Sequence, residues 1–487
     1  MELESLLSSL SESLESMGIK GYVVGGLVRD KLTNRTPKDI DLVVASDHQS
    51  IIDCVYKVLN VQSSFIDNKH QIHKVILPVK IGNTAISEVD IAFQNCDLSE
   101  SLSARDFTIN ALALPLERYN DDDFLDHLID PHNGIADIRG KIIRMVKKTV
   151  FLDDPTRMIR AVRIASSLQF TIDTKTNVQI KNDAKSITLA PMEIIGEELL
   201  RILENSKSKA YIEILDRLNL LEYIFPELVL TKGVTQPKEH YWNVWEHSLH
   251  TLDFAEHLMN GHQNSPIYSM APWTVELEAH FSQLVNAKHS HKVYFKLAAL
   301  LHDIAKPQTK TLDETGRTRF PKHEIIGAQT TKQRLESLKI DKKSITKVKT
   351  MIEYHLRPNH MLQGVNSPTR KAIYKYFKDL GESGIDVLFI HLADYLAAKG
   401  PDLTLSDWAT RAKMVNHIIN VHNEQNIETK KDKLIDGHQL MEHFNLKPSN
   451  EVGELLNELN EAQGLGRIHT YDEAIKLAEE LINNNQG

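Results

Sequence analysis

Short apolar runs alternate with polar segments in the first part of the chain, and each run ends at glycine or polar residues. Runs of this length predict β-strands, here over residues 22–24, 40–44, 74–79 and 88–93. Elsewhere, apolar residues recur every three or four positions, as in residues 3–17, which is typical of an amphipathic helix. This mixture of strands and helices predicts a small α/β domain over residues 1–135.

The pattern changes after residue 135, where strand-like runs nearly vanish and helical spacing dominates. A stretch that contains Gly233 and Pro237 interrupts the helical spacing and predicts a linker over residues 228–240. The expected fold class is therefore α+β. Its predicted parts are an α/β domain, a helical neck and body, a second helical domain and a helical tail, over residues 1–135, 136–235, 240–400 and 405–487.

Composition narrows the class of protein only slightly. The length of 487 residues exceeds what one hydrophobic core supports, which agrees with several domains. The net charge of −9 gives no general indication of a nucleic-acid partner. The chain has two cysteines, no basic residue before Lys20 and no apolar run of membrane-spanning length, so we expect a cytoplasmic protein without membrane association.

The segment Gly-Gly-Leu-Val-Arg-Asp at residues 25–30 is the first candidate for chemistry. It follows the predicted strand 22–24 and leads into a helix. Glycines at such a turn let backbone N–H groups approach a phosphate, and the start of the helix favours an anion. Gly25, Gly26 and Arg29 are therefore predicted to bind the phosphates of a ligand.

Two carboxylates begin the next predicted strand. Asp39 and Asp41 are two residues apart, so in a strand they point to the same face. Convergent carboxylates beside a phosphate-binding turn suit phosphoryl or nucleotidyl transfer with two Mg²⁺ ions. Glu88 and Asp90 both qualify as the third acid, and we choose Asp90 because it lies between apolar neighbours in the middle of its run.

Two further polar motifs follow the predicted sheet. Arg105 and Asp106 open an apolar stretch that predicts a helix, on which Asp106 and Asn110 share a face and are placed to hold a ribose hydroxyl or another Asp side chain. Later, Asp154 and Arg157 lie three residues apart at the start of another helix. Asp154 suits the helix N-cap, but together the pair also matches the base-pairing edge of cytosine or adenine. Two nearby arginines complete the predicted nucleotide site, namely Arg160 and Arg163.

The region 240–400 is rich in histidine. His302 and Asp303 follow an apolar helix, and other candidate ligands lie in separate helical segments, namely His247, His323, His355 and Asp394. Imidazole and carboxylate groups from several helices suit a centre with one or two metal ions, either a divalent transition metal or Mg²⁺. Such a centre suits hydrolysis of a phosphoester. Other histidines, including His289 and His291, are expected at the surface.

Taken together, the motifs of the first 235 residues resemble those of the class II tRNA nucleotidyltransferases, or CCA-adding enzymes, and of the related bacterial poly(A) polymerases. The resemblance implies a polymerase-β-like head and an all-helical neck and body. It implies that Asp39 and Asp41 bind the catalytic metals, that Asp154 and Arg157 select the base, and that the sugar and phosphates are held by Arg105, Asp106 and Asn110. The implied partners are tRNA, CTP and ATP.

The order His…His-Asp…His…His…Asp in residues 240–400 is similar to that of the HD-domain metal-dependent phosphohydrolases, which implies an all-helical HD domain. Segments 434–437 and 452–456 resemble the C-terminal segment of members that carry such a domain, which implies contact with tRNA. The interval between Asp90 and Arg105 holds only 14 residues and resembles that of the subgroup that adds two cytidylates without the terminal adenylate.

These resemblances leave three functions open. The first is addition of C and A, or of C alone, to tRNA 3′ ends. The second is synthesis of poly(A) from ATP. The third is a phosphohydrolase or 2′,3′-cyclic phosphodiesterase whose working site is the HD domain. The sequence does not give the oligomeric state.

Overall fold

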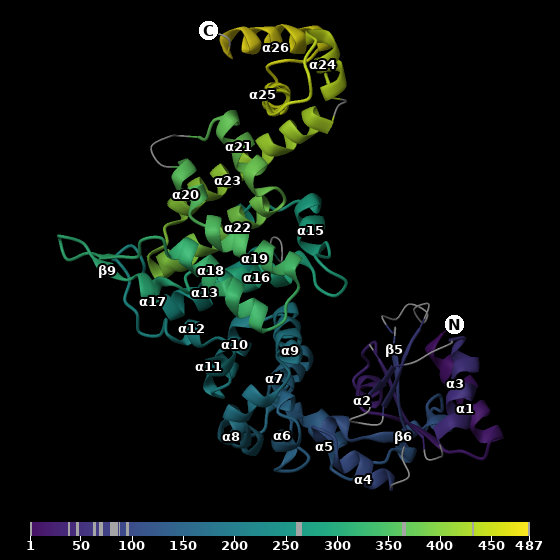
Figure 1. Ribbon diagram of the computed structural model, residues 1–487. Helices are drawn as coiled ribbons and strands as arrows, with labels where there is room; N and C mark the ends of the chain where they lie inside the picture. The colour runs from purple at the N-terminus through teal and green to yellow at the C-terminus, as the bar shows by residue number, and fades with distance from the viewer. Residues whose placement is uncertain are drawn as a thin grey trace. The chain divides into compact units, whose positions relative to one another are not determined.

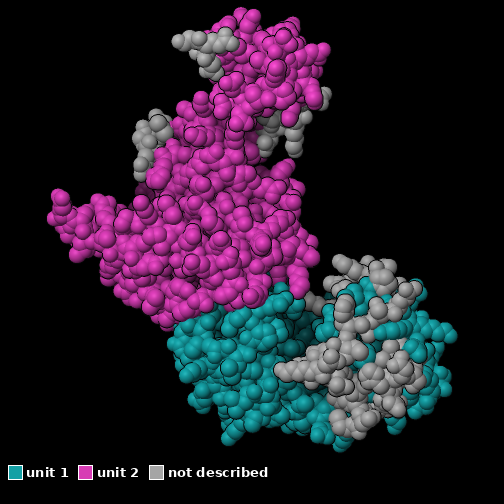
Figure 2. Space-filling view, in the orientation of Figure 1, with its two compact units in different colours: residues 1–205, 211–224 teal, residues 206–210, 225–487 magenta. Residues whose placement is uncertain are grey.

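The protein divides into two compact units, which the computed structural model shows in Figures 1 and 2. The first unit comprises residues 1–205 and 211–224, and the second comprises residues 206–210 and 225–487. The structure describes residues 2–37, 39–44, 48–61, 65–67, 72–77, 86, 88–93, 97–259, 265–362, 367–430 and 433–485. No helix among these residues is long and apolar enough to cross a membrane.

The first unit is built on a six-stranded sheet with the order β3-β4-β5-β2-β1-β6. Its strands, in chain order, are β1 (Gly21–Val24), β2 (Ile40–Val44), β3 (Phe65–Asp67), β4 (Ile72–Ile76), β5 (Glu88–Phe93) and β6 (Ala113–Pro115). The pair β2–β5 is parallel, and the other neighbouring pairs are antiparallel. The predicted strand 74–79 is found as β4, and residues 78–79 lie outside the described part of the chain.

Four helices accompany this sheet, namely α1 (Leu3–Ser16), α2 (Gly26–Leu32), α3 (His48–Leu59) and α4 (Leu98–Ser103). Helix α1 packs against α3, and it buries the leucines whose spacing predicted it, Leu3, Leu6, Leu7, Leu10 and Leu14. Under the centre of the sheet, Val24 and Val43 pack with apolar residues of the following segment, Leu102, Ala111 and Ala113. This packing fixes the ends of β1 and β2, where the polar motifs lie.

The helix predicted to follow Arg105 does not form. Phe107 is extended, with φ −128° and ψ 150°, and residues 108–110 form only one 3₁₀ turn, η1 (Thr108–Asn110). The Thr108 amide donates to the Arg144 carbonyl at 2.9 Å, and Phe107 forms an isolated β-bridge with Met145. Pairing with a segment almost 40 residues later therefore replaces the local helical hydrogen bonds.

The rest of the first unit is largely helical. Helices α7 and α9 pack against each other. The elements are η2 (Leu116–Arg118), η3 (Phe124–His127), α5 (Gly134–Gly140), β7 (Ile142–Ile143), α6 (Val150–Asp153), α7 (Thr156–Leu168), β8 (Thr171–Ile172), α8 (Thr174–Asp183), η4 (Ala184–Leu189), α9 (Met192–Glu204), α10 (Ser208–Arg217), whose first residues belong to the second unit, and α11 (Leu221–Ile224).

The second unit has a helical core in which α13 packs against α16 and α22, and α19 packs against α16, α18 and α22. Its elements before the tail are α12 (Pro226–Val229), α13 (Val244–Leu258), α14 (Pro266–Met270), α15 (Val275–Ser282), α16 (His291–Leu301), α17 (Lys306–Thr309), β9 (Thr311–Leu312), β10 (Thr318–Arg319), α18 (His323–Ser337), α19 (Lys342–Tyr354), α20 (Arg357–Leu362), α21 (Arg370–Leu380), α22 (Ser383–Lys399), η5 (Gly400–Asp402) and α23 (Leu405–Lys430).

A buried ion pair ties residues 206–210 into the second unit. Glu256 on α13 accepts hydrogen bonds from the amides of Lys207 and Ser208, and its carboxylate lies 3.1 Å from Nζ of Lys296 on α16. Both charged side chains are 6% exposed. Because a buried carboxylate needs a charged partner and hydrogen bonds, this set of contacts explains why a short piece of α10 belongs with residues far along the chain.

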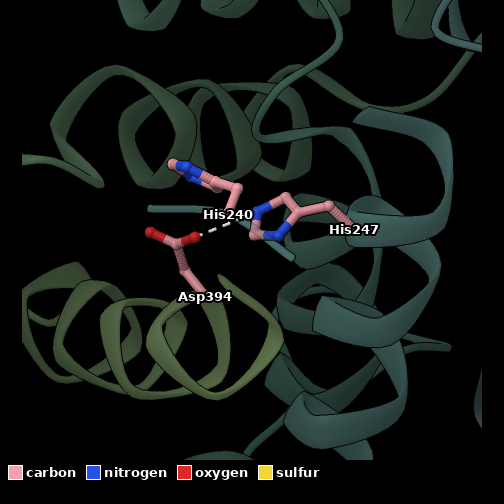
Figure 3. Close-up of side chains that lie close together, drawn as sticks. All are labelled: His240, His247 and Asp394. Carbon is pink, nitrogen blue, oxygen red and sulfur yellow. Dashed lines mark ion pairs between the residues drawn. The ribbon is translucent and has the colours of Figure 1, made fainter. Parts of the chain in front are cut away.

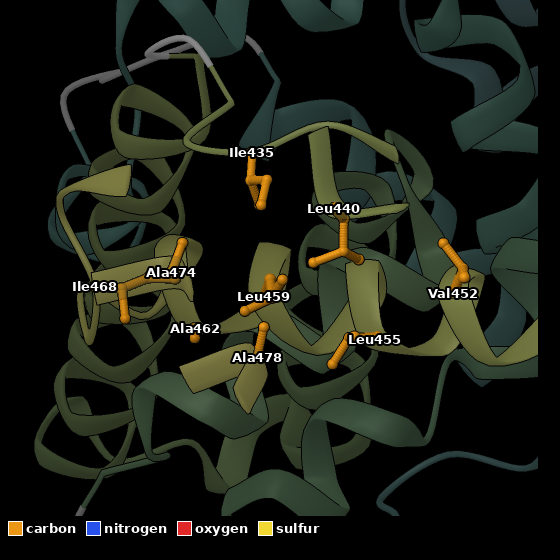
Figure 4. Packing of buried hydrophobic residues seen from close by; sticks show 9 residues of the cluster. All are labelled: Ile435, Leu440, Val452, Leu455, Leu459, Ala462, Ile468, Ala474 and Ala478. Carbon is orange, nitrogen blue, oxygen red and sulfur yellow. The ribbon is translucent and has the colours of Figure 1, made fainter. Parts of the chain in front are cut away.

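The C-terminal tail has a hydrophobic core of its own (Figure 4). It consists of α24 (Gly437–Phe444), α25 (Asn450–Gly464) and α26 (Tyr471–Asn485). Helix α24 begins with a capping box in which Asp436 and Gln439 satisfy each other's backbone amides. The core is formed by Ile435, Leu440, Val452, Leu455, Leu459, Ala462, Ile468, Ala474 and Ala478. The predicted α+β class with a helical remainder is thus confirmed, and the four-part division stays a prediction.

Candidate active sites

The glycine turn lies where β1 enters α2. Gly25 adopts φ +69°, a conformation that glycine tolerates and other residues rarely adopt. A Cβ at this position would collide with the Arg105 guanidinium and the Asp41 carboxylate. The next amide, of Gly26, donates a hydrogen bond to Asp41. Gly25 therefore lets a cation, a carboxylate and the start of a helix come together.

The parallel pairing of β2 with β5 places Asp41 directly beside Asp90 in the ladder. Asp39 precedes β2 and is exposed, and its charge reaches Asp41. Glu88, the alternative third acid, lies two residues before Asp90 and pairs with Ile76 at the antiparallel edge of β5. The register therefore favours Asp90 as the third carboxylate.

The electrostatic environment of these carboxylates suits a cation. Burial raises the pKa of Asp41, the Arg105 charge opposes this shift, and the Asp39 charge adds to it. Burial also raises the pKa of Asp90 to about 6, against the effect of Lys74. Asp90 Oδ1 is buried and has no hydrogen-bond partner among the described residues. Hard carboxylate oxygens that are incompletely paired fit Mg²⁺.

Lys74 on β4 is a member of this site that was not predicted. Its Nζ lies 2.8 Å from both Glu88 Oε1 and Asp90 Oδ2. These two carboxylates raise the pKa of the Lys74 ammonium despite its partial burial. The only signal in the sequence is a lysine within an apolar run, and the strand pairing that brings it to Asp90 is not local.

A chain of hydrogen bonds links the predicted sugar-binding residues to the glycine turn. Arg29 Nη1 donates to Asn110 Oδ1 at 2.8 Å, and Asn110 Nδ2 donates to Asp106 Oδ1 at 3.0 Å. The other Asp106 oxygen lies 3.0 Å from Nε of Arg160. Burial favours the neutral form of Asp106, but Arg160 and the Asn110 hydrogen bond hold its pKa below the usual value. Asp106 and Asn110 therefore meet without the predicted helix.

Asp154 and Arg157 lie at the start of α7. Asp154 Oδ1 accepts hydrogen bonds from the amide and the hydroxyl of Thr156, so the capping role expected for it is present. Its other oxygen is 3.8 Å from Nε of Arg157. Arg157 Nη2 donates to the Ala104 carbonyl at 3.0 Å, while Nη1 is buried without a hydrogen-bond partner among the described residues. Arg157 Nη1 therefore has hydrogen-bonding capacity that no described residue satisfies.

Arg163, the last predicted nucleotide-binding residue, is engaged elsewhere. Its Nε donates to Glu198 Oε2 on α9 at 2.8 Å, and its side chain is 19% exposed. This contact joins α7 to α9. Arg163 thus supports the helix that carries Arg157 and Arg160.

The six predicted metal ligands of the histidine-rich region come together in the second unit. His247 lies on α13, His302 and Asp303 follow α16, and the others come from α18, the end of α19, and α22, namely His323, His355 and Asp394. His247 Nε2 is 3.0 Å from Asp394 Oδ1, 3.2 Å from His302 Nε2 and 3.4 Å from Asp303 Oδ2. Asp303 Oδ1 is 3.3 Å from His323 Nε2.

These contacts define two overlapping ligand groups that share Asp303. One is His247, His302 and Asp303, and the other is Asp303, His323 and His355; within each, all ligand atoms lie within 4.8 Å. Burial lowers the pKa of His247, and it lowers the pKa of His355 to about 3, so these imidazoles are neutral as metal binding requires. Asp303 is kept ionised against its burial by His302 and Lys306. The donor set fits a divalent transition metal or Mg²⁺.

His240 extends this centre and was missed in the sequence analysis. It forms a third group with His247 and Asp394, shown in Figure 3. Burial and the nearby Lys306 charge lower the pKa of His240 to about 4, and its Nδ1 has no hydrogen-bond partner among the described residues. His240 lies in the predicted linker, where the sequence has no helical context that would mark it as a ligand.

A second His/Asp cluster is formed by residues of α15, α16, α19 and α22. Asp386 on α22 is fully buried and lies 3.0 Å from Nε2 of His280 and 3.8 Å from Nδ1 of His291. Nζ of Lys347 on α19 lies 2.8 Å from the same carboxylate, so the cluster already holds a cation. The expectation that His289 and His291 are surface residues is wrong, since they are 2% and 3% exposed. Helix contacts distant in sequence bury them.

The folds and sites define a nucleotidyltransferase head with an appended HD domain, and family comparisons agree. The poly(A) polymerase head domain family matches residues 21–144, the HD domain family matches residues 244–399, and tRNA nucleotidyltransferase domain 2 matches residues 325–478. These matches, together with the relatives below, support a class II tRNA nucleotidyltransferase that carries an HD domain.

Relatives match over most of the chain. An A-adding tRNA nucleotidyltransferase of Deinococcus radiodurans is 27% identical and covers 80% of this chain and 81% of its own. A CC-adding tRNA nucleotidyltransferase of Thermus thermophilus is 27% identical and covers 93% of this chain and 92% of its own. The Thermotoga maritima CCA-adding enzyme complexed with tRNA shares the fold, with a TM-score of 0.61, 19% identity and coverage of 98% of this chain and 95% of that one.

The glycine turn gives a test of the head site. We expect Gly25→Ala to lower the nucleotidyl-transfer rate by about 10²-fold, because its Cβ displaces Arg105 and Asp41. Gly18→Ala is a matched control, since Gly18 has φ +70° but no atom within 4 Å of an added Cβ. Both substitutions therefore place a side chain at a position with φ near +70°. Equal rates for the two variants would contradict the assignment of Gly25 to the site.

Proposed function

We propose that this protein adds nucleotides to the 3′ end of tRNA from CTP and ATP, without a nucleic-acid template. The observation that carries the proposal is the pairing of Asp41 with Asp90 next to the Gly25–Gly26 turn. The names of the Deinococcus and Thermus relatives, which span most of the chain, support tRNA as the acceptor. A cytoplasmic location is proposed with it, because these substrates occur there.

The head carboxylates are proposed to hold two Mg²⁺ ions, with Asp39 and Asp41 as the main ligands and Asp90 as the third acid. The donors fit this ion, since they are oxygens and Asp90 Oδ1 is unpaired among the described residues. Bound Mg²⁺ would activate the 3′ hydroxyl of the RNA and stabilise the triphosphate. The same hydroxyl then attacks the α-phosphate of the nucleotide, and pyrophosphate leaves.

The protein's own groups are proposed to bind and orient the nucleotide. The start of α2 and the guanidinium groups of Arg29 and Arg105 face the triphosphate, since they surround the carboxylates. The Asp106–Asn110 pair binds the sugar. For the base, Asp154 Oδ2 accepts from the exocyclic amine, and Arg157 Nη1 donates to the adjacent ring nitrogen or carbonyl.

This base-binding pair explains how CTP and ATP are accepted while UTP and GTP are rejected. Cytosine and adenine each present an amine beside an acceptor, whereas uracil and guanine lack that arrangement. A poly(A) polymerase, the alternative, would use ATP almost exclusively. Pairing through Asp154 and Arg157 gives no such preference for ATP, which favours the tRNA enzyme.

Replacement of Asp41 tests the proposed reaction. We expect Asp41→Asn to lower cytidylate incorporation into tRNA by about 10²–10³-fold, because a charged group at the reacting centre is lost, while tRNA binding persists. Glu88→Gln is the matched control, since Glu88 lies on β5 but not level with Asp41, and its loss is expected to be much smaller. Full incorporation by Asp41→Asn would show that the catalytic site lies elsewhere.

A separate hypothesis concerns whether the protein adds the terminal adenylate. The short interval of 14 residues between Asp90 and Arg105 favours addition of two cytidylates without the terminal adenylate. Purified protein is incubated with CTP, ATP and a tRNA that lacks its 3′ end, and the products are sequenced. We expect products ending in two cytidylates. Efficient addition of the terminal adenylate would contradict the hypothesis that only two cytidylates are added. The protein would then add the full CCA sequence.

A second activity is favoured by the HD centre, which we propose hydrolyses phosphoesters. The supporting observation is that ligands from five helical segments come together. Three imidazoles lie within 3.4 Å of Asp303, His355 lies within 4.8 Å of it, and Asp394 lies 3.0 Å from His247. A bound divalent ion would activate water there. Nζ of Lys306, 2.6 Å from Asp303 Oδ2, provides a cation next to the ligands that is suited to a phosphate oxygen.

Removal of two ligands tests the HD centre. We expect His302→Ala/Asp303→Ala to lose bound divalent metal, measured by elemental analysis, and with it the phosphatase and 2′,3′-cyclic phosphodiesterase activities. His257→Ala is the control, because His257 lies on the same α13 as His247 while its Nδ1 bonds the Asp253 carbonyl of its own helix. Unchanged metal content and activity in the double variant would rule out this centre.

A further inference from the structure

A pocket of about 340 Å³ lies in the second unit, outside both sites described above. Its walls come from α21, α23 and α25 and from the segment before α24. The lining residues are Tyr374, Phe377, Lys378, His422, Gln425, Lys433, Asn460 and Gln463. The volume falls in the range of small-molecule sites, about 300–1,000 Å³.

The charge of the pocket favours an anion. Lys378 and Lys433 contribute two ammonium groups, and none of the lining residues carries a carboxylate. Burial lowers the pKa of His422 to about 4, so its imidazole is neutral at physiological pH. Three acids of the surrounding helices are paired with bases, Asp379 with Arg357, Glu424 with Arg370 and Glu461 with Lys371.

One wall of the pocket is aromatic. The His422 ring stacks on Phe377, with centroids 3.4 Å apart and an angle of 11° between the planes. Tyr374 precedes Phe377 by one helical turn on α21, so it shares that face of the helix. Flat aromatic and imidazole rings are the surfaces on which nucleobases stack in single-stranded RNA sites.

Three amide side chains also line the pocket. Gln425, Asn460 and Gln463 each offer a carbonyl acceptor and an NH₂ donor. Two of them are held by the backbone, since Gln425 Nε2 donates to the Arg370 carbonyl at 3.0 Å and Gln463 Oε1 accepts from the Leu434 amide at 3.3 Å. Oriented amides match the mixed donors and acceptors along the edge of a nucleobase.

We propose that this pocket binds a nucleobase together with its 5′-phosphate. The base stacks on the wall formed by Tyr374 and His422, the amides bond its edge, and Lys378 and Lys433 hold the phosphate. Two kinds of ligand present this combination of base and phosphate, namely a free nucleotide and an unstacked nucleotide of an RNA chain. The pocket shares no residue with the head site, so the proposal does not depend on the head's proposed function.

The first arm of the test measures free nucleotides by calorimetry. AMP and CMP are titrated into the full-length protein carrying Asp154→Ala and Arg157→Ala, which weakens binding in the head. On this background, Lys378→Ala/Lys433→Ala and His422→Ala should each lower the affinity by about tenfold. His422→Phe should retain it, because the flat ring remains. Lys375→Ala is the control, since Lys375 is exposed on α21 and does not line the pocket.

The second arm measures binding of a tRNA that lacks its 3′ end, with the same pocket variants in the otherwise unchanged protein. Loss of affinity in His422→Ala, recovered in His422→Phe, without binding of free AMP or CMP, assigns the pocket to an RNA nucleotide. Weaker binding of AMP or CMP by His422→Ala in the first arm, recovered in His422→Phe, assigns the pocket to a free nucleotide. If His422→Ala binds as tightly as its parent protein in both arms, the proposal is wrong, even where the lysine variants bind tRNA more weakly. Thermal melting establishes that each variant is folded.

Discussion

The parallel pairing of β2 with β5 is the constraint on which the head site depends. It sets Asp41 level with Asp90, and a shift of one residue would send one of the two carboxylates to the opposite face of the sheet. The close approach at Gly25 and the Arg105 guanidinium are arranged around this pair of carboxylates. The sheet therefore supplies the negative charge, and the turn supplies the phosphate-binding amides and cations.

Lysines balance buried or partly buried carboxylates throughout the protein, but to different extents. At Asp386, Lys347 and His280 occupy both carboxylate oxygens, so the cluster is complete without a metal. At Asp303, Lys306 contacts one oxygen while the imidazoles of His247, His302 and His323 lie within 3.4 Å of the carboxylate, so this cluster gathers more potential metal-binding nitrogens. Two clusters that each have a lysine at the central carboxylate thus differ in the number of imidazoles close to it.

Local patterns predicted the elements and residues whose environment is set by neighbours in the sequence. The apolar runs predicted β2 and β5, the Gly-Gly turn predicted the start of α2, and helical spacing predicted α1. Contacts between residues distant in the sequence account for the predictions that failed and for the site residues that were missed. Pairing with residues 144–145 replaced the helix expected after Arg105, strand pairing brought Lys74 to Asp90, and folding of the linker brought His240 to Asp394. Nothing in the neighbouring sequence marks these contacts.

The central claim is that the head carboxylates support metal-dependent nucleotidyl transfer onto tRNA. The most direct measurement is incorporation of labelled CTP by the unsubstituted protein into a tRNA that lacks its 3′ end, with Mg²⁺ and with the metal removed by a chelator. If the carboxylates act through a divalent cation, we expect incorporation of CTP with Mg²⁺ and loss of this incorporation when the metal is chelated. No incorporation with Mg²⁺, or equal incorporation after chelation, would contradict the account.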